Sequence, residues 1–258
     1  MYFKGELGMA QVRQIANMLE LFEYFARVQR PAGLAELSAH FGWPRSSTFN
    51  IIDTLVETGF LYEPRARNGY YPTPRWLALS EQISSAEPLS EQAIHLVRQI
   101  AGKTRETVWI ATTSGQYAVM LHVITSPHPI RYAAEPGKRL PLHATATGQA
   151  LLSQMPSTQQ KNLLKRARFI KYGVGSPMSM EEVLIQLQEG KARGWFQSAS
   201  NYSPDLGGVS MPISLAGRTF AITAAGPLFR VAEKFSEIAS LMHATLAPLH
   251  TELNKAEV

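Results

Sequence analysis

The alternation of apolar and polar positions predicts three helices near the start of the chain. Apolar residues recur every three or four positions from Val12 to Arg30, which is the period of an amphipathic helix. The same period predicts a short helix over Leu34–Phe41 and a third over Pro44–Thr58. The side chains expected on the buried face of the third helix are Phe49, Ile52, Leu55 and Val56.

A tight turn separates the second and third of these helices. Gly42 suits the left-handed conformation that ends many helices, and Pro44 is favoured in the first turn of the next one. Two short strands, Phe60–Tyr62 and Tyr70–Pro72, then flank a segment rich in turn residues and predict a hairpin. Three helices followed by a hairpin indicate a winged helix-turn-helix domain over residues 9–75.

Helical spacing resumes after the hairpin and is interrupted at residues 85–88. We therefore expect a helical linker over residues 76–88 and a second domain over residues 89–258, in which strands alternate with helices. The predicted fold class is α+β. The expected strands are Thr107–Thr113, Ala118–Ile124, Ile130–Ala134, Val209–Leu215 and Thr219–Ala225. The expected helices are Leu89–Lys103, Gly148–Gln154, Thr158–Ala167, Met180–Arg193 and Phe229–Asn254.

Composition narrows the class of protein. The chain has no cysteine, which excludes disulfides, thiolate catalysis and cysteine-ligated metals. Its first residues carry charges and lack an apolar core, and no apolar run approaches the roughly 20 residues that a membrane span needs. We therefore expect a cytoplasmic protein without a membrane partner. The net charge is +5, which favours polyanionic partners only weakly, because residues 1–80 contain eight Lys or Arg and seven Asp or Glu.

The start of the third helix carries the residue types that read DNA. Arginine pairs with guanine and asparagine with adenine in the major groove, while hydroxyls suit phosphate oxygens. The candidate DNA contacts on this helix are Arg45, Ser46, Ser47, Thr48 and Asn50. Arg65 and Arg67 stand at the tip of the hairpin, from which they can reach a flanking backbone or minor groove. The alternative interpretation is that these residues only cap the start of the helix and face solvent.

Four sequence segments together resemble the IclR family of transcriptional regulators. They are GLAELSAHFGWPRSSTFNIIDTLVETGFL in the first domain and RLPLHATATGQALL (139–152), RGWFQSASNYSPDLGGVSMPI (193–213) and FAITAAGP (220–227) in the second. The resemblance extends from about Val12 to Leu249, and it departs from the family at Asn50, where many members carry arginine. That departure bears on base preference.

The resemblance implies a winged helix-turn-helix domain joined by a helix to a GAF-like ligand-binding domain with a mainly antiparallel sheet. It also implies a homodimer or homotetramer that binds double-stranded operator DNA and represses or activates operons for small-molecule catabolism. An organic acid is the usual effector. The competing interpretation is a winged-helix module that binds another protein and carries a small-molecule sensor domain.

The segment HATATGQALL suggests where an acid binds. His143, Thr145 and Thr147 precede a predicted helix, and the free amides and positive dipole end of a helix start suit a carboxylate. A threonine that only caps the helix is the alternative. By resemblance to the family, the effector pocket includes Ala146, Thr147, Ser198, Gly208, Thr223 and Ala225.

Several of these positions have lost polar groups. Ser198 stands where an aspartate is frequent, and Gly208 where a cysteine is frequent. Such changes enlarge a site and remove hydrogen bonds, so we expect a larger and more apolar ligand than a small oxoacid, such as an aromatic carboxylate. Trp109, Met120 and Phe196 are candidates for the pocket wall, with a plain core role as the alternative.

Enzymatic chemistry finds little support. His122, His128 and His143 are scattered, and no nucleophile elbow, zinc-binding helix motif or phosphate-cradling glycine loop accompanies them. We expect no catalytic residues, no metal and no cofactor.

Overall fold

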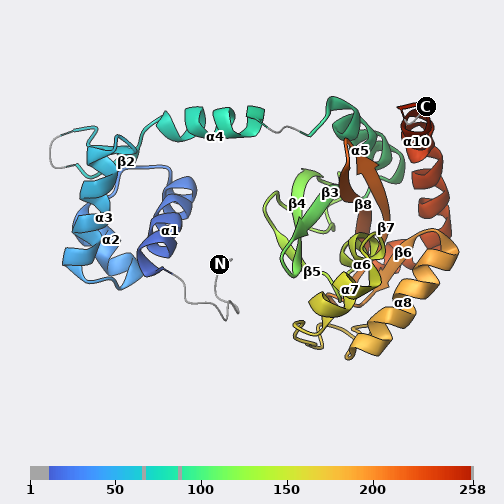
Figure 1. Ribbon diagram of the computed structural model, residues 1–258. Helices are drawn as coiled ribbons and strands as arrows, with labels where there is room; N and C mark the ends of the chain where they lie inside the picture. Colours follow the sequence, from blue (N-terminus) through green and yellow to red (C-terminus); the bar gives the residue numbers. More distant parts are fainter. Residues whose placement is uncertain (1–11, 66–67, 87–88, 257–258) are drawn as a thin grey trace. The chain divides into compact units, whose positions relative to one another are not determined.

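The computed structural model describes residues 12–65, 68–86 and 89–256, and the chain divides into one unit up to Pro88 and another from Leu89 (Figure 1). Each unit has its own apolar core. The elements of the first unit are α1 (Arg13–Val28), α2 (Leu34–Phe41), α3 (Arg45–Glu57), β1 (Leu61–Tyr62), β2 (Tyr71–Pro72) and α4 (Arg75–Ala86).

The turn between α2 and α3 is fixed by local contacts. Gly42 adopts the left-handed conformation, with φ +67°, as the sequence predicts. The Trp43 ring stacks on Phe41 with centroids 4.1 Å apart, and its carbonyl accepts a hydrogen bond of 2.8 Å from the Ser38 hydroxyl. The angle at which α3 leaves this turn is therefore set by packed side chains.

The predicted hairpin is confirmed, and a third segment extends it. β1 and β2 pair antiparallel, and Ala32 and Tyr70 form a further antiparallel bridge through two backbone hydrogen bonds of 3.1 and 2.9 Å. The Thr73 hydroxyl donates to the Gly59 carbonyl at 2.7 Å and ties the base of the wing to the end of α3. Arg67 at the wing tip lies outside the described residues.

Two helical faces differ from the prediction. Phe49 is 48% exposed and Val56 is also exposed, whereas Ile52 and Leu55 are buried as predicted. In α1 only side chains of its second half are buried, so apolar residues of the first turns lie at the surface. Each helix carries more apolar positions than one buried stripe can hold, and the tertiary packing selects among them.

The second unit contains a six-stranded antiparallel sheet in the order β5-β4-β3-β8-β7-β6. Its strands are β3 (Thr107–Ser114), β4 (Tyr117–Ile124), β5 (Arg139–Pro141), β6 (Phe196–Ala199), β7 (Leu206–Leu215) and β8 (Arg218–Pro227). Its helices are α5 (Glu91–Thr104), α6 (Ala146–Ser153), α7 (Ser157–Leu164), α8 (Met180–Arg193), α9 (Leu228–Val231), a 3-10 turn (Ala232–Lys234) and α10 (Phe235–Ala256).

Helices pack on both faces of this sheet (Figure 1). Val108 and Ile110 of β3 face a core shared with α5 and α10, whereas Trp109 and Ala111 face a second core shared with α6 and α8. The alternation follows from the period of two in a strand. The predicted α+β class, with a winged helix-turn-helix and a mainly antiparallel sheet, is confirmed.

The second unit differs from the prediction in three respects. Residues 130–134 form no strand, because the carbonyls of Ile130 and Tyr132 accept hydrogen bonds from side chains instead of a neighbouring strand. The edge strands β5 and β6 were not predicted. The single closing helix is broken into α9, a 3-10 turn and α10.

The start of α6 is a fourth correction, and it concerns the expected pocket. The helix begins at Ala146, so Ala146 and Thr147 form its first turn instead of preceding it. Gly148 allows this turn to approach the backbone of Leu142 closely, because a Cβ at position 148 would collide with that backbone. The first turn of α6 is thereby held against the sheet.

Candidate functional site

The exposed face at the start of α3 is the first candidate site. Arg45, Ser46, Ser47 and Asn50 are all exposed, and so is Arg65 on the wing. Ser47 and Asn50 line a solvent-open surface groove between α3 and the start of α1. The structure therefore leaves five of the seven predicted DNA contacts free to meet a ligand.

Thr48 is a correction. Its side chain is only 1% exposed, and its hydroxyl donates to the Pro44 carbonyl at 3.1 Å. A threonine hydroxyl has one proton, which this local bond uses. Thr48 therefore holds the first turn of α3 together from the inside and cannot reach DNA.

Phe49 is a surface residue that the sequence assigned to the core. It lies between the exposed Arg45 and Asp53 on successive turns of α3. An exposed phenylalanine can contact the methyl group of thymine in the major groove. Asp53 and Glu57 are exposed further along the helix, where phosphates would repel them, so the surface suited to DNA is confined to the first two turns.

The second candidate site is a small cavity between the first turn of α6 and the sheet, with about 310 Å³ of empty space when its solvent-filled opening is counted. Seven of the nine predicted effector residues line it, namely Trp109, Ala146, Thr147, Ser198, Gly208, Thr223 and Ala225. The lining also includes Thr145, which the sequence placed at the helix start suited to a carboxylate, and five residues that were not predicted, namely Tyr132, Leu140, Tyr202, Leu206 and Gly207.

Met120 and Phe196 are corrections, because both are core residues outside the lining. Met120 pairs with Ala111, two positions along β3 from the cavity residue Trp109. The ring of Phe196 occupies the space that a side chain at Gly190 of α8 would need. Both side chains therefore fill the sheet–helix interface and support the cavity from outside.

A chain of buried hydrogen bonds crosses one wall of the cavity. Trp109 Nε1 donates to Thr147 Oγ1 at 3.2 Å, and Thr147 Oγ1 lies 2.8 Å from Thr223 Oγ1. Thr223 in turn donates to Ser210 Oγ at 2.8 Å, and Ser210 donates to the Ile222 carbonyl at 3.3 Å. Since each hydroxyl has one proton, Thr147 must donate to Thr223. The hydroxyls in this wall therefore offer a ligand acceptors and no free proton.

Free donors lie at the start of α6. Thr145 caps the helix, with its hydroxyl accepting from the Gly148 amide at 3.0 Å. The capping alternative is thus correct for Thr145, but the cap uses only one of the first-turn amides. The Ala146 and Thr147 amides donate to no other group in the part of the chain that the structure describes. Two amides and the positive end of the helix dipole are available to an anion.

The rest of the lining is neutral and partly aromatic. No charged side chain contributes to the cavity wall among the described residues. The ring centroid of Tyr132 is 5.5 Å from that of Trp109, and Tyr202 packs against Tyr172 at 5.4 Å. Burial raises the pKa of Tyr202 above its usual value, so this phenol stays neutral. The cavity suits a flat apolar body with one anionic end.

The histidines that the structure describes belong to no metal-binding cluster. His143 is buried beside Phe169, with ring centroids 5.2 Å apart, and burial lowers the pKa of its imidazole. No group of three or more histidine, aspartate or glutamate side chains could hold a metal within residues 12–65, 68–86 and 89–256. In the same ranges, no helix has the length and apolar content to cross a membrane.

A chain that carries a winged helix-turn-helix and, in a second unit, a cavity without charged side chains has the features of the transcriptional regulators that sense a small molecule. Comparison with known proteins identifies the group within it. The family model described as bacterial transcriptional regulator IclR C-terminal matches residues 82–247, and the IclR helix-turn-helix domain matches residues 14–65. The chain belongs to the IclR family and is a transcriptional regulator with a DNA-binding and a ligand-binding domain.

Individual relatives are distant. The HTH-type transcriptional regulator KdgR of Dickeya chrysanthemi is 24% identical over 205 residues, covering 79% of this chain and 67% of the relative. The crystal structure of the Thermotoga maritima IclR has a TM-score of 0.77 at 16% identity, covering 94% and 99% of the two chains. An IclR homolog from Microbacterium hydrocarbonoxydans, complexed with 4-hydroxybenzoate, has a TM-score of 0.66 at 20% identity, covering 91% and 99%.

Proposed function

We propose that this regulator binds operator DNA through α3 and the wing, and that an aromatic carboxylic acid in the second unit controls the binding. The observation that supports the proposed ligand is the cavity at the start of α6. It has free amides, aromatic walls and no charged side chain. The same features give no support to a catalytic role, and the named relatives are regulators.

The DNA half rests on the exposed first turns of α3. Arg45, Phe49 and Asn50 are exposed there, and we expect Arg45 to pair with a guanine, Asn50 with an adenine and Phe49 to contact a thymine methyl. Ser46 and Arg65 suit phosphates on either side. We propose that the chain acts as a dimer, which would place two copies of α3 in major grooves about 34 Å apart or a multiple of that distance.

The ligand half follows from matching donors to acceptors. The carboxylate of the acid would accept from the Ala146 and Thr147 amides, and its ring would pack against Trp109 and Tyr132. A hydroxyl on the ring would donate to a hydroxyl oxygen of the buried chain, such as that of Thr223. The homolog complexed with 4-hydroxybenzoate supplies an acid of this kind as the probe.

The test uses the full chain, a labelled promoter fragment and 4-hydroxybenzoate, with pyruvate and glyoxylate as small oxoacids for comparison. We expect the aromatic acid to raise the melting temperature and to change the affinity for the fragment, because a ligand shifts an equilibrium only by preferring one state. Tight binding of the oxoacids with none of the aromatic acid would contradict the proposed ligand class.

One variant isolates the amide contact. Ala146→Pro removes one first-turn amide at a position where proline is tolerated, and the extended backbone of Thr145 suits a residue that precedes proline. We expect 4-hydroxybenzoate to bind more weakly by roughly tenfold or more, the loss of one hydrogen bond to a charged group. Ala146→Gly keeps the amide and is the matched control, for which we expect nearly unchanged affinity.

A further inference from the structure

The loop between β4 and β5, residues 125–138, supplies a cavity wall without regular secondary structure of its own. Tyr132 lies on this loop and lines the cavity. Its ring is held by Trp109 on one side and by Lys138, whose ammonium lies 4.6 Å from the ring centroid. The position of this wall therefore depends on what fixes the backbone of the loop.

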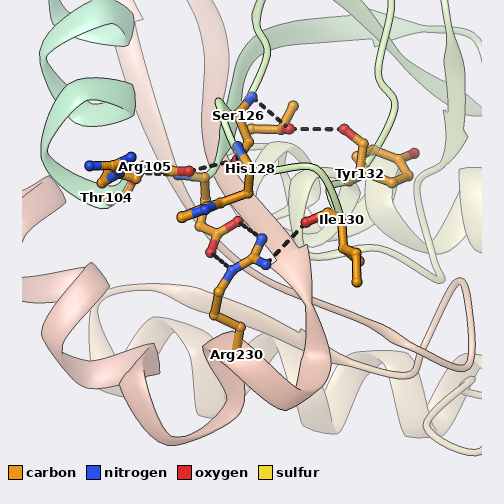
Figure 2. A network of polar contacts seen from close by, with 9 residues as sticks. Thr104, Arg105, Ser126, His128, Ile130, Tyr132 and Arg230 are labelled. Atoms are coloured by element: carbon orange, nitrogen blue, oxygen red, sulfur yellow. Dashed lines mark hydrogen bonds and ion pairs between the residues drawn. The ribbon is translucent and has the colours of Figure 1, made fainter.

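Hydrogen bonds to residues outside the loop fix it at several points (Figure 2). Thr107 Oγ1 donates to the Tyr132 carbonyl at 2.8 Å and accepts from the Ser126 amide at 3.2 Å. The Ser126 hydroxyl donates to the Arg105 carbonyl at 2.7 Å. Arg230 Nη1 of α9 donates to the Ile130 carbonyl at 3.0 Å. The two carbonyls that flank Arg131 are therefore both tied down.

Arg230 is itself locked in place. Its Nε and Nη2 atoms donate to the two carboxylate oxygens of Glu106 at 2.5 and 2.7 Å, a bidentate arrangement that fixes the plane of the guanidinium. The Glu106 side chain is 4% exposed and rests on Gly226 of β8, where any side chain would displace it. The third nitrogen of the guanidinium, Nη1, points to Ile130 and donates to its carbonyl (Figure 2).

We propose that Glu106 and Arg230 are positioning residues of the ligand cavity: their ion pair holds the 125–138 loop and so sets the place of Tyr132 against the bound molecule. Neither residue lines the cavity, so both act through the loop. The inference rests on the proposed function in that the cavity is taken to be the ligand site. The position of Tyr132 in the ligand-free protein can nevertheless be measured separately.

The first measurement needs no ligand. In full-length protein labelled with 3-fluorotyrosine, the fluorine signal of Tyr132 is assigned by its loss in Tyr132→Phe. We expect Arg230→Met to shift or broaden this signal while Tyr117 of β4 keeps its own. Lys234→Met, which removes an exposed positive charge one helical turn away, is the control and should change neither. An unchanged Tyr132 signal in Arg230→Met would overturn the proposal.

Arg230→Met leaves the Glu106 carboxylate buried and unpaired, which can prevent folding. If it does, the double variant Glu106→Leu with Arg230→Met removes both charges and is read in the same way. A Tyr132 signal that stays at its wild-type position in this double variant also overturns the proposal.

The second measurement is a double-mutant cycle on 4-hydroxybenzoate affinity. We expect Arg230→Met to weaken binding by about tenfold in the wild-type background and to have little further effect in Tyr132→Ala, because the two residues act in series. Equal losses in both backgrounds would show that Arg230 does not act through Tyr132. If the wild-type chain does not bind this acid, the proposed ligand fails, while the fluorine signal still decides the positioning role.

Discussion

At the scale of single residues, the threonines near the candidate sites differ in the hydrogen bonds that their hydroxyl groups make. Thr48 and Thr145 both lie near a helix start, yet the hydroxyl of Thr48 closes a helix turn internally and that of Thr145 caps a helix. Thr147 takes part in a directed hydrogen-bond chain that reaches Thr223, 76 positions away. Assigning each proton separates residues that can contact a ligand from those that hold the site in shape.

Arg45 gives a prediction about base preference. Its side chain is exposed at the start of α3, and no hydrogen bond or ion pair to another described residue has to be broken before it can contact DNA. We expect Arg45→Ala to weaken operator binding by about 1–3 kcal/mol and to relax the preference at one base pair. Binding to a set of operator variants measures both effects. Arg98→Ala removes the same charge from the second unit and is the control. An equal loss of affinity for every operator variant in Arg45→Ala would indicate that Arg45 contacts a phosphate.

His143 gives a prediction about pH. Burial lowers the pKa of the folded imidazole below 6.5, while the unfolded chain keeps a value near 6.5. As the pH falls through this value, the unfolded state binds a proton that the folded state does not, so stability is lost on acidification. The contribution is at most about 1.4 kcal/mol per pH unit.

Urea unfolding at several pH values between neutrality and about pH 5 measures this slope. The variant His143→Phe keeps a ring against Phe169 and removes the titration, so we expect a shallower loss of stability on acidification. His122, whose pKa is also lowered by burial, remains and contributes its own slope. An identical slope in both proteins would rule out the assignment to His143.

At the scale of elements, periodicity identified helices better than it identified their buried faces. Phe49 has the right spacing to Ile52 for a common inner face, but only Ile52 is buried, because α3 packs through a narrower stripe. The spacing of residues within one helix carries no information about the width of its contact. The start of α6 was placed two residues late for a related reason, since the small residues of its first turn add nothing to an apolar pattern.

The candidate cavity was predictable in part where it lies on regular elements, although the strand residues Leu140, Leu206 and Gly207 were missed. Trp109, Ser198, Gly208 and Thr223 sit on strands, and the sequence anticipated all four. Tyr132 lies on an irregular loop held by side chains from distant positions, and no local pattern marks it. Residues that act at a site through long-range hydrogen bonds therefore need a structure to be found.

At the scale of the whole molecule, DNA and ligand are proposed to bind to different units, so control must be a coupling free energy between two sites. Such a coupling is reciprocal: whatever factor the acid imposes on DNA affinity, DNA imposes on the affinity for the acid. The unit boundary after residue 88 places all the candidate DNA contacts on one side and the whole cavity on the other.

The charge of the molecule sets the last prediction. Residues 1–80 are nearly neutral overall, so DNA affinity must come from a few exposed cations on α3 and the wing. Each phosphate contact releases counterions, and the logarithm of the affinity then falls with the logarithm of the salt concentration by about 0.9 per contact. We expect a steep linear decrease for the wild-type chain, measured from low to physiological salt.

Arg65→Gln should reduce the slope of this plot by about 1 for each Arg65 that contacts a phosphate, while leaving the order of preferred sequences unchanged. Comparison with Arg45→Ala distinguishes a residue that contacts the phosphate backbone from one that recognises a base. It also discriminates the competing function, because a protein partner held by apolar contacts on the winged helix would show no such slope. A promoter affinity that does not vary with salt would therefore favour the protein-binding module over the DNA-binding regulator.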